Sequence, residues 1–344
     1  MTAVAIIGAG LAGCAVGYYL ARAGCEVVVY EAAERIAAGA SGNEVGMVNP
    51  RFSAFETAES LFYVDAFERA VALFETLGDV EWNPCGALHL ITDEKRGKRY
   101  RQTVEHWDLD GLRVVDAAEA SVIAGVDVPF EAMVLERSGS VSPRRLCEVL
   151  ARDLDVRFGE RVGDLDGLEA DVVIVANGMG AAVLLDLPLK GVRGQITEVR
   201  GSAASRDLKV NLHYGGYFSA ARAGGVHTIG ATFQRWLDHT DILDEDDVYN
   251  VEKLSGFFPE LAGGLEVVGH RGSLRTTAPD HFPVIGHVRD HIYVSSAHGS
   301  HGVISSIGGA QLLVDMIMKQ DVGLSEETVE ALCPRRFKDA KELG

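Results

Sequence analysis

The chain opens with two short apolar runs on either side of a helical stretch that is rich in small residues. Residues 4–7 form the first run, which ends in glycine. Residues 11–23 show helical periodicity up to Gly24, and residues 27–30 form the second run, which ends at Glu31. Strand, glycine turn, helix and strand in this order predict one βαβ unit at the start of the chain.

Helical signals recur in the following part of the chain. Residues 58–77 carry apolar side chains at helical spacing, which predicts a helix. Ser142 followed by Pro143 is typical of a helix start, with serine as the N-cap and proline at the first helical position. We therefore expect a second helix over residues 144–154.

The second half of the chain contains both buried and alternating strand patterns. Residues 171–177 are almost wholly apolar, as in a parallel strand that is covered on both faces. Residues 192–235 alternate like antiparallel strands, and residues 292–296 form another short strand. A glycine-containing turn then precedes a helix that we expect over residues 303–318.

These patterns predict an α/β fold in which a Rossmann-type nucleotide-binding domain is interrupted by a second domain of mainly antiparallel sheet. We assign residues 1–84, 138–194 and 268–344 to the nucleotide-binding domain. The inserted α+β substrate domain then takes residues 85–137 and 195–267. A length of 344 residues suits two such domains.

Composition narrows the class of protein further. The formal net charge is −18. No apolar run reaches the roughly 18 residues of a spanning helix, so we expect no membrane segment. The location that we expect is the cytoplasm. The N-terminus leads almost directly into a strand pattern, which predicts no signal peptide. The five cysteines are scattered and the eleven histidines show no metal-ligand spacing, so we expect reduced thiols and no metal.

The glycine turn after the first strand has the spacing of a dinucleotide fingerprint. It consists of Gly8, Ala9, Gly10, Leu11, Ala12 and Gly13. The first glycine allows a tight turn, the second lets the backbone approach a pyrophosphate, and the third lets helix and strand pack closely. The pyrophosphate would then lie at the helix N-terminus. Glu31 follows Gly13 by 18 residues, which places its carboxylate for a ribose hydroxyl.

The number of fingerprints favours FAD over a nicotinamide. There is one, whereas an enzyme that passes electrons from a nicotinamide to a flavin usually needs two sites. Asn177 and Gly178 end a buried strand, as expected of a turn beside the adenine half of FAD. A second glycine turn, at residues 299–302, begins the last long helix. Its N-terminus either faces the flavin edge where negative charge develops on reduction, or only caps the helix.

Several motifs together resemble the D-amino-acid oxidase family of flavoproteins, which includes glycine oxidase and sarcosine oxidase. They are the N-terminal unit, the strand end at residues 177–178, residues 275–280 (RTTAPD) and residues 299–302 (GSHG). The resemblance covers nearly the whole chain and implies an FAD domain of the glutathione-reductase and D-amino-acid-oxidase kind that oxidises a C–N bond. Besides the fingerprint and Glu31, it implies these FAD contacts: Ala40, Ser41, Gly42, Asn43, Val162, Ala176, Asn177, Gly178, Gly299, Ser300, His301, Gly302 and Val303.

A narrower set of motifs is similar to the oxidoreductase half of the bifunctional tRNA-modifying MnmC enzymes. It comprises residues 40–43 (ASGN), Gly46, residues 49–50 (NP), 85–86 (CG), 138–140 (SGS), 194–195 (GQ), 215–217 (GGY), 229–231 (IGA) and 299–300 (GS). This similarity implies removal of the carboxymethyl group, as glyoxylate, from carboxymethylaminomethyl uridine at the tRNA wobble position. The methyltransferase half of that family would precede the fingerprint, so we expect a separate tRNA methyltransferase as partner, or no methylation.

The resemblance also implies which side chains act on the substrate. Arg275 matches the family's carboxylate-binding arginine, because a guanidinium holds a carboxylate through two parallel hydrogen bonds; the alternative is a structural salt bridge. Tyr214 and Tyr217 either line the pocket or pack on the sheet. His301 either contacts the flavin or caps the helix. Sarcosine oxidases bind flavin covalently through a cysteine near the position of Ser273, so serine here implies non-covalent FAD.

Three functions remain open at this point: a tRNA-modifying oxidoreductase, a small-molecule glycine, sarcosine or D-amino-acid oxidase or dehydrogenase, and a flavin-binding subunit without turnover. The charge of −18 favours a small N-substituted glycine over a tRNA substrate. Two basic clusters oppose this, and they form either a phosphate-binding face or ordinary solvated surface. The clusters are Lys95, Arg96, Lys98, Arg99 and Arg101, and Arg335, Arg336 and Lys338.

Overall fold

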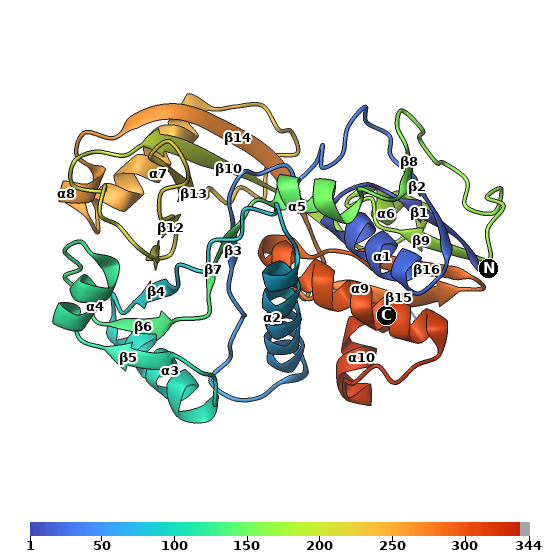
Figure 1. Cartoon of the computed structure of the whole chain (residues 1–344), viewed down its shortest axis with the longest axis horizontal. Coiled ribbons are helices and arrows are strands. Elements are labelled where there is room, and N and C mark those ends of the chain that lie inside the picture. Colours follow the sequence, from blue (N-terminus) through green and yellow to red (C-terminus); the bar gives the residue numbers. More distant parts are fainter. Residues whose placement is uncertain (338–344) are drawn as a thin grey trace.

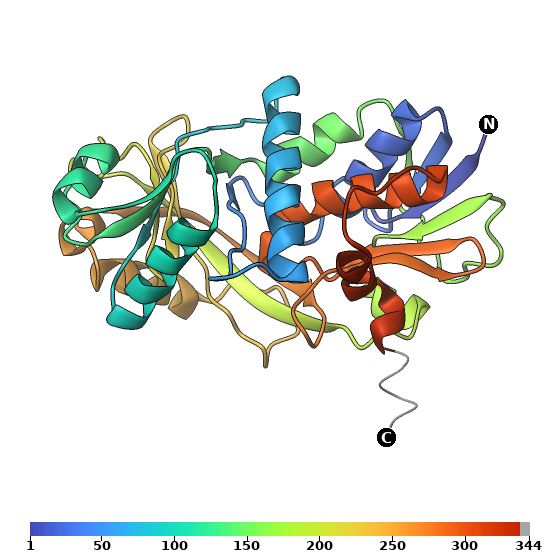
Figure 2. The ribbon, with the colours of Figure 1, turned by 90° about the horizontal axis from the view of Figure 1, so that it is seen from below.

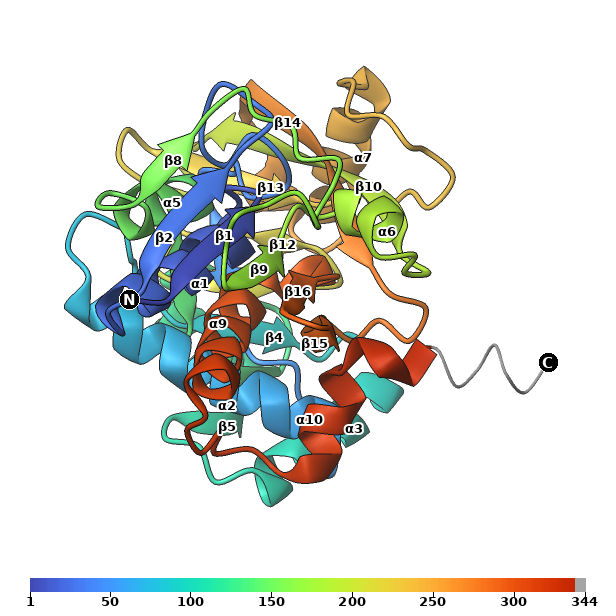
Figure 3. The ribbon, with the colours of Figure 1, turned by 90° about the vertical axis from the view of Figure 1, so that its right-hand side faces the viewer.

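Six strands form a mostly parallel sheet at one end of the molecule in the computed structural model, which describes residues 1–337 (Figure 1). In sheet order they are β15 (Val284–Arg289), β16 (Ile292–Ser296), β9 (Val172–Val175), β1 (Ala3–Ile7), β2 (Glu26–Tyr30) and β8 (Asp155–Arg157), an order visible in Figure 3. β15 pairs antiparallel with β16, and the other neighbours pair parallel. The sheet confirms the expected Rossmann-type core.

Eight strands form a second sheet at the other end. In order they are β14 (Glu266–Thr277), β10 (Lys190–Arg200), β13 (Val226–Gly230), β12 (Tyr217–Phe218), β11 (Asn211–His213), β4 (Ala87–Leu90), β6 (Ala132–Leu135) and β5 (Leu112–Val115). Neighbouring strands of this sheet pair antiparallel, except β11 and β4, which pair parallel. These two strands come from segments that are far apart in the sequence. The expectation of antiparallel pairing is therefore incomplete at this position.

Helices cover both faces of the six-stranded sheet. α1 (Leu11–Arg22), α2 (Ala58–Thr76), α5 (Pro143–Leu150) and α9 (Gly302–Met318) share the larger core with it, and α6 (Gly180–Leu184) packs on the opposite face. Figure 2 shows α2 between the two sheets and against α9. α10 (Glu326–Leu332) follows and contacts α2. Because both faces are covered, four of the five residues of β1 are buried.

The eight-stranded sheet has its own apolar core. α4 (Ala117–Ala124), α7 (Asp244–Ser255) and α8 (Pro259–Ala262) share that core, while α3 (Glu94–His106) packs near β5 and β6. A two-stranded sheet of β3 (Gly46–Val48) and β7 (Gly139–Val141) lies between the two large sheets (Figure 1). The predicted domain limits at residues 194 and 268 fall inside β10 and β14. The division into a nucleotide-binding domain and a substrate domain stays a prediction.

Local capping explains where several predicted helices begin. The Ser142 hydroxyl accepts a hydrogen bond from the Arg145 N–H at 3.3 Å, and Pro143 is the first residue of α5, as the sequence predicts. At the start of α2, Thr57 and Ser60 form a reciprocal capping box. Each cap satisfies backbone groups that would otherwise lack partners at the helix end.

The segment Gly299–Met318 is long and apolar enough, by length and composition alone, to cross a membrane. In the part of the chain described here it is the one such segment, and 61 % of its most apolar window is buried inside the protein. Small residues along α9, including Gly308 against Ala66 of α2, allow this close packing. The apolar composition therefore serves the core of the fold.

Candidate active site

The fingerprint turn closes against two neighbouring strand ends. Gly8 has φ +104°, donates its N–H to the Tyr30 carbonyl at 2.8 Å, and a Cβ there would lie 2.7 Å from the Ala176 carbonyl. A Cβ at Gly13 would overlap the Gly8 carbonyl. Side chains are therefore excluded at both positions, and the turn brings the ends of β1, β2 and β9 together.

Polar groups surround the N-terminus of α1. The Glu31 carboxylate, at the end of β2, accepts hydrogen bonds from Ala9 N–H at 2.8 Å and from Ala33 N–H at 2.9 Å. The Ser41 hydroxyl accepts a hydrogen bond from Leu11 N–H at 3.0 Å. These contacts put Glu31 and Ser41 at the turn where the sequence predicts ribose and pyrophosphate binding. Their contact with FAD stays a prediction.

Two asparagines provide a test of whether the predicted residues fit a cofactor. The side-chain oxygens of Asn43 and Asn177 are buried and have no hydrogen-bond partner within residues 1–337. A buried polar atom without a partner is costly, so a ligand with donor groups is the expected complement. Ala40 and Ser273 also line a cavity of about 500 Å³ between the segment 35–40 and β14. The residues present therefore fit FAD.

The remaining predicted cofactor residues occupy three places. Gly42 is pressed against the Arg271 guanidinium, and Val162 packs on the core beneath the six-stranded sheet. Gly178 lies within reach of Thr276, and its carbonyl accepts a hydrogen bond from Ser296 at 3.1 Å. These positions stay predictions, as do the others in the cofactor set.

The turn before α9 is a short 3₁₀ segment, Gly299–His301, and Gly302 and Val303 begin the helix. A backbone bridge from Thr277 to His298 ties this turn to the end of β14. Exposed Ser300 lies in the turn, and Gly299 has φ +56°. The structure thus places this turn beside the strand that carries Arg275.

His301 is a neutral side chain in this setting. Burial lowers its pKa to about 4, the Arg51 guanidinium adds to the effect, and a backbone hydrogen bond at Asn49 opposes it. Its ring centre lies 5.3 Å from that of Tyr63. An uncharged imidazole can donate or accept a hydrogen bond here but does not add positive charge to the site.

Three polar residues lie near His301, and the sequence motifs include one of them, Asn49, but neither of the two histidines. His89 and His213, from β4 and β11, stack with ring centres 4.4 Å apart, and Asn49 Nδ2 lies 3.1 Å from His213 Nε2. Burial lowers the pKa of His89 to about 4, with smaller contributions from Arg99 and His301, and burial also lowers that of His213. The sequence signal for these two residues is a histidine within each of two apolar strands, and such a signal is weak.

Arg275 is a cationic group of this site and is partly buried. Its Nη1 donates one long hydrogen bond of 3.5 Å to the Thr232 carbonyl, and no carboxylate of residues 1–337 forms an ion pair with it. Burial lowers the pKa of Arg275, and the nearby Tyr217 phenol acts in the opposite direction. Gly194, on the neighbouring strand, leaves room for the guanidinium. A partly buried cation that pairs with no acid of residues 1–337 is suited to bind an anion.

The two predicted tyrosines point to different places. Tyr217 pairs with His213 across β12 and β11, so both side chains share the face near Arg275, and burial raises the pKa of Tyr217 to about 12. Tyr214 is 2 % exposed and packs with Phe257 and Phe258 in the core of the eight-stranded sheet. The structure therefore brings Tyr217 to Arg275 but leaves Tyr214 in the core.

The predicted basic clusters differ in how free their charges are. On α3, Arg96 and Arg101 are paired with Asp93 and Glu131, while no acid of residues 1–337 pairs with the exposed Lys95, Lys98 and Arg99. In the C-terminal cluster, Arg336 forms a 2.8 Å ion pair with Asp280, Arg335 is exposed, and Lys338 lies outside the described residues. The α3 cluster is the stronger candidate for phosphate contact.

Comparison with known proteins identifies relatives along almost the whole chain. Proteins named tRNA 5-methylaminomethyl-2-thiouridine biosynthesis bifunctional protein MnmC, from Pseudomonas fluorescens and Nitrosospira multiformis, are each 30 % identical over 96 % and 97 % of this chain. The chain spans 58 % and 60 % of their lengths.

Solved structures share the fold at lower identity. Glycine oxidase from Bacillus cereus has a TM-score of 0.80 and 21 % identity, covering 94 % of this chain and 99 % of its own. Iminodiacetate oxidase from Chelativorans has a TM-score of 0.75 and 21 % identity, covering 94 % and 97 %. The family model described as FAD dependent oxidoreductase (DAO) matches residues 3–316. The chain therefore belongs to the DAO family of FAD-dependent oxidoreductases.

Proposed function

We propose that this protein removes the carboxymethyl group, as glyoxylate, from carboxymethylaminomethyl uridine or its 2-thio form at the wobble position of tRNA. The observation that carries the proposal is Arg275, a partly buried cation whose one hydrogen bond within residues 1–337 goes to a carbonyl at 3.5 Å. The substrate is an N-substituted glycine, so it supplies the missing carboxylate. The name and 30 % identity of the MnmC relatives support tRNA as the carrier.

The proposed roles of the residues follow from their charges. FAD, when bound, supplies the hydride acceptor for the carbon between the nitrogen and the carboxylate, and water then hydrolyses the C=N bond to the amine and glyoxylate. Arg275 holds the carboxylate, and the neutral Tyr217 phenol donates a hydrogen bond nearby. His213 and His301 stay uncharged, so the positive charge of Arg275 remains the main attraction for the anion.

The basic face of α3 is proposed to contact tRNA phosphates. Arg99 contributes to lowering the pKa of His89, which places α3 next to the histidine pair. Changing Lys95, Lys98 and Arg99 to glutamate should weaken tRNA binding. The slope of log binding constant against log salt concentration should also become less negative, by roughly 0.7–0.9 for each phosphate contact that is lost. Unchanged affinity across salt would show that α3 is ordinary surface.

The function is tested by analysis of the tRNA itself. The holoenzyme is incubated with tRNA that carries carboxymethylaminomethyl uridine, and the nucleosides are then identified by mass. We expect aminomethyl uridine and an equal amount of glyoxylate, and much less of both with Arg275→Met. Unaltered nucleosides, under conditions in which a small N-alkylglycine is oxidised, would contradict the tRNA assignment. A cytoplasmic location and a separate methyltransferase partner belong to the same proposal.

A second candidate is oxidation of a free N-substituted glycine, and the net charge of −18 favours it because an acidic surface repels RNA. Both candidates use the same clamp at Arg275. They differ outside the clamp, since only the first needs a surface for the remainder of a large substrate.

A further inference from the structure

The segment at residues 232–243, which we call the aromatic segment, exposes two large rings and a cation. Trp236 is 76 % exposed and Phe233 is 46 % exposed, and the Arg235 guanidinium lies 5.4 Å from the Phe233 ring centre. The other two tryptophans, Trp82 and Trp107, are largely withdrawn from solvent. Apolar rings that are grouped and exposed mark a binding surface more often than isolated ones.

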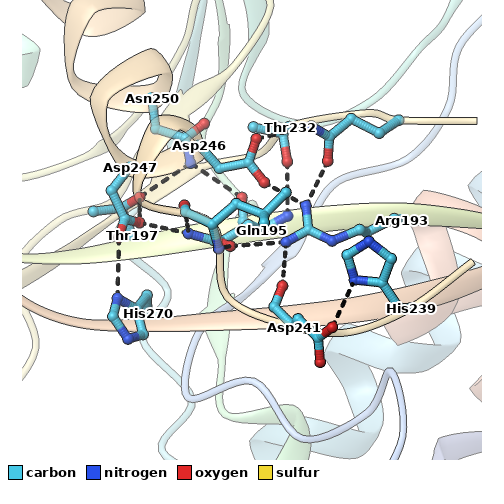
Figure 4. Close-up of polar contacts among 12 residues, drawn as sticks. Arg193, Gln195, Thr197, Thr232, His239, Asp241, Asp246, Asp247, Asn250 and His270 are labelled. Atoms are coloured by element: carbon cyan, nitrogen blue, oxygen red, sulfur yellow. Dashed lines mark hydrogen bonds and ion pairs between the residues drawn. The ribbon is translucent and has the colours of Figure 1, made fainter. Parts of the chain in front are cut away.

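A buried polar network holds the start of the aromatic segment in place (Figure 4). The Thr232 hydroxyl accepts a hydrogen bond from Gln195 N–H at 2.8 Å, and the Gln234 amide donates to the Asp246 carboxylate at 2.9 Å. Arg193, fully buried, is ion-paired with the same Asp246. Thr232 and Gln234 are thus anchored inward, and the alternation of an extended chain turns Phe233 between them toward solvent.

The aromatic segment also borders the proposed carboxylate clamp. The Arg275 guanidinium lies 6.0 Å from the Phe233 ring centre and bonds to the Thr232 carbonyl. Further along, Thr240 and Ile242 line the cavity of about 500 Å³ that also contains Ser273. A substrate whose carboxylate reaches Arg275 therefore comes close to the Phe233 ring, and Trp236 follows three residues further along the same segment.

We propose that the aromatic segment binds the single-stranded nucleotides that flank the modified wobble uridine, with Trp236 and Phe233 stacking on bases. This inference rests on the proposed function and adds the surface by which the tRNA is held. Proteins recognise single-stranded RNA loops largely by stacking bases on aromatic and arginine side chains. Asp238 and Asp241 are exposed in the same segment and repel phosphate, so the segment favours contact with base faces over contact with the backbone.

Binding of an unmodified anticodon stem-loop RNA to the holoenzyme tests this inference without turnover. Trp236→Ala should weaken the RNA affinity roughly 5- to 150-fold, the range measured for the loss of one stacked base, while kcat/KM for a small N-alkylglycine stays unchanged. Tyr249→Ala is the matched control, because Tyr249 on α7 is 49 % exposed and carries Lys253 at 5.6 Å from its ring. It should leave both quantities unchanged.

Tryptophan emission gives a second readout. The RNA should quench the emission of the wild type, and Trp236→Phe should lose most of this quenching but retain affinity, because phenylalanine still stacks. Equal RNA affinity for Trp236→Ala and Tyr249→Ala, with tRNA still turned over, would overturn the inference and leave the proposed function intact. No RNA binding and no tRNA turnover by the wild type would overturn both. Wild-type dimers that Trp236→Ala converts to monomers, without a change in RNA affinity, would assign the surface to self-association and overturn the inference.

Discussion

Arg275 and Arg193 lie on neighbouring strands, and replacing each with methionine should separate a functional arginine from a structural one. Arg193 is fully buried and forms an ion pair with Asp246. Arg275 makes one long hydrogen bond to the Thr232 carbonyl and no ion pair within residues 1–337. The same substitution therefore removes very different sets of contacts.

The magnitudes follow from these contacts. Arg193→Met leaves the Asp246 carboxylate buried without its cation, which should lower the free energy of unfolding by about 3–5 kcal/mol. Arg275→Met removes a cation whose pKa is already lowered by burial, so the free energy of unfolding should change by about 1 kcal/mol or less. It also removes charged hydrogen bonds to the substrate, which should cost about 1.5–3 kcal/mol, or roughly 10- to 150-fold in kcat/KM.

Both variants can be compared by urea unfolding, followed by far-ultraviolet circular dichroism with saturating FAD. Steady-state oxidation of a small N-alkylglycine gives kcat/KM on the same preparations. We expect Arg275→Met to be stable and slow, and Arg193→Met to be unstable. Strong destabilisation by Arg275→Met with unchanged kcat/KM would instead make Arg275 a structural residue and exclude its role as the carboxylate clamp.

Further predictions concern the cofactor and the effect of pH. A Cβ at Gly13 would overlap the Gly8 carbonyl, so Gly13→Ala should lose bound flavin, whereas Gly78→Ala, with no atom near its Cβ position, should retain the wild-type ratio of flavin to protein absorbance. Ser273 offers no thiol to the flavin, so acid precipitation should release all FAD into the supernatant; flavin in the pellet would indicate a covalent link. Burial lowers the pKa of His89, His298 and His301 from 6.5 to about 4 in the folded chain. Their contribution to stability is therefore complete above about pH 6.5 and is lost as the pH falls toward 4, at about 1.4 kcal/mol per pH unit for each. The urea midpoint of the wild type should therefore be lower at about pH 5 than at about pH 7.5, and the difference should be smaller in His298→Gln. Equal midpoints of the wild type at the two pH values would contradict this.

The parts of the fold that depend on neighbours in sequence could be predicted from the sequence. The βαβ unit is one example, because the close approach of Gly13 to the Gly8 carbonyl is a requirement within six residues. The start of α5 is another, since Ser142 and Pro143 satisfy the helix end locally. The strand over Ile292–Ser296 is confirmed with the same limits.

The composition of the candidate site depends on contacts that no local pattern encodes. His89 and His213 meet because β4 and β11 pair in parallel, and the sequence does not specify which separate strands become neighbours. Tyr214 and Tyr217 are three residues apart, but the turn at Gly215, with φ +97°, sends them to opposite faces. The sequence could name both tyrosines but could not choose between them.

Anaerobic bleaching of the bound flavin, followed by absorbance, shows whether the protein oxidises the modified tRNA. Glycine, sarcosine and tRNA that carries carboxymethylaminomethyl uridine are offered in parallel, and glyoxylate is measured at the end. We expect rapid bleaching by the modified tRNA, with one glyoxylate formed per flavin reduced. Bleaching by glycine or sarcosine alone, with none by the tRNA, would contradict it and assign the protein to small-molecule amine oxidation.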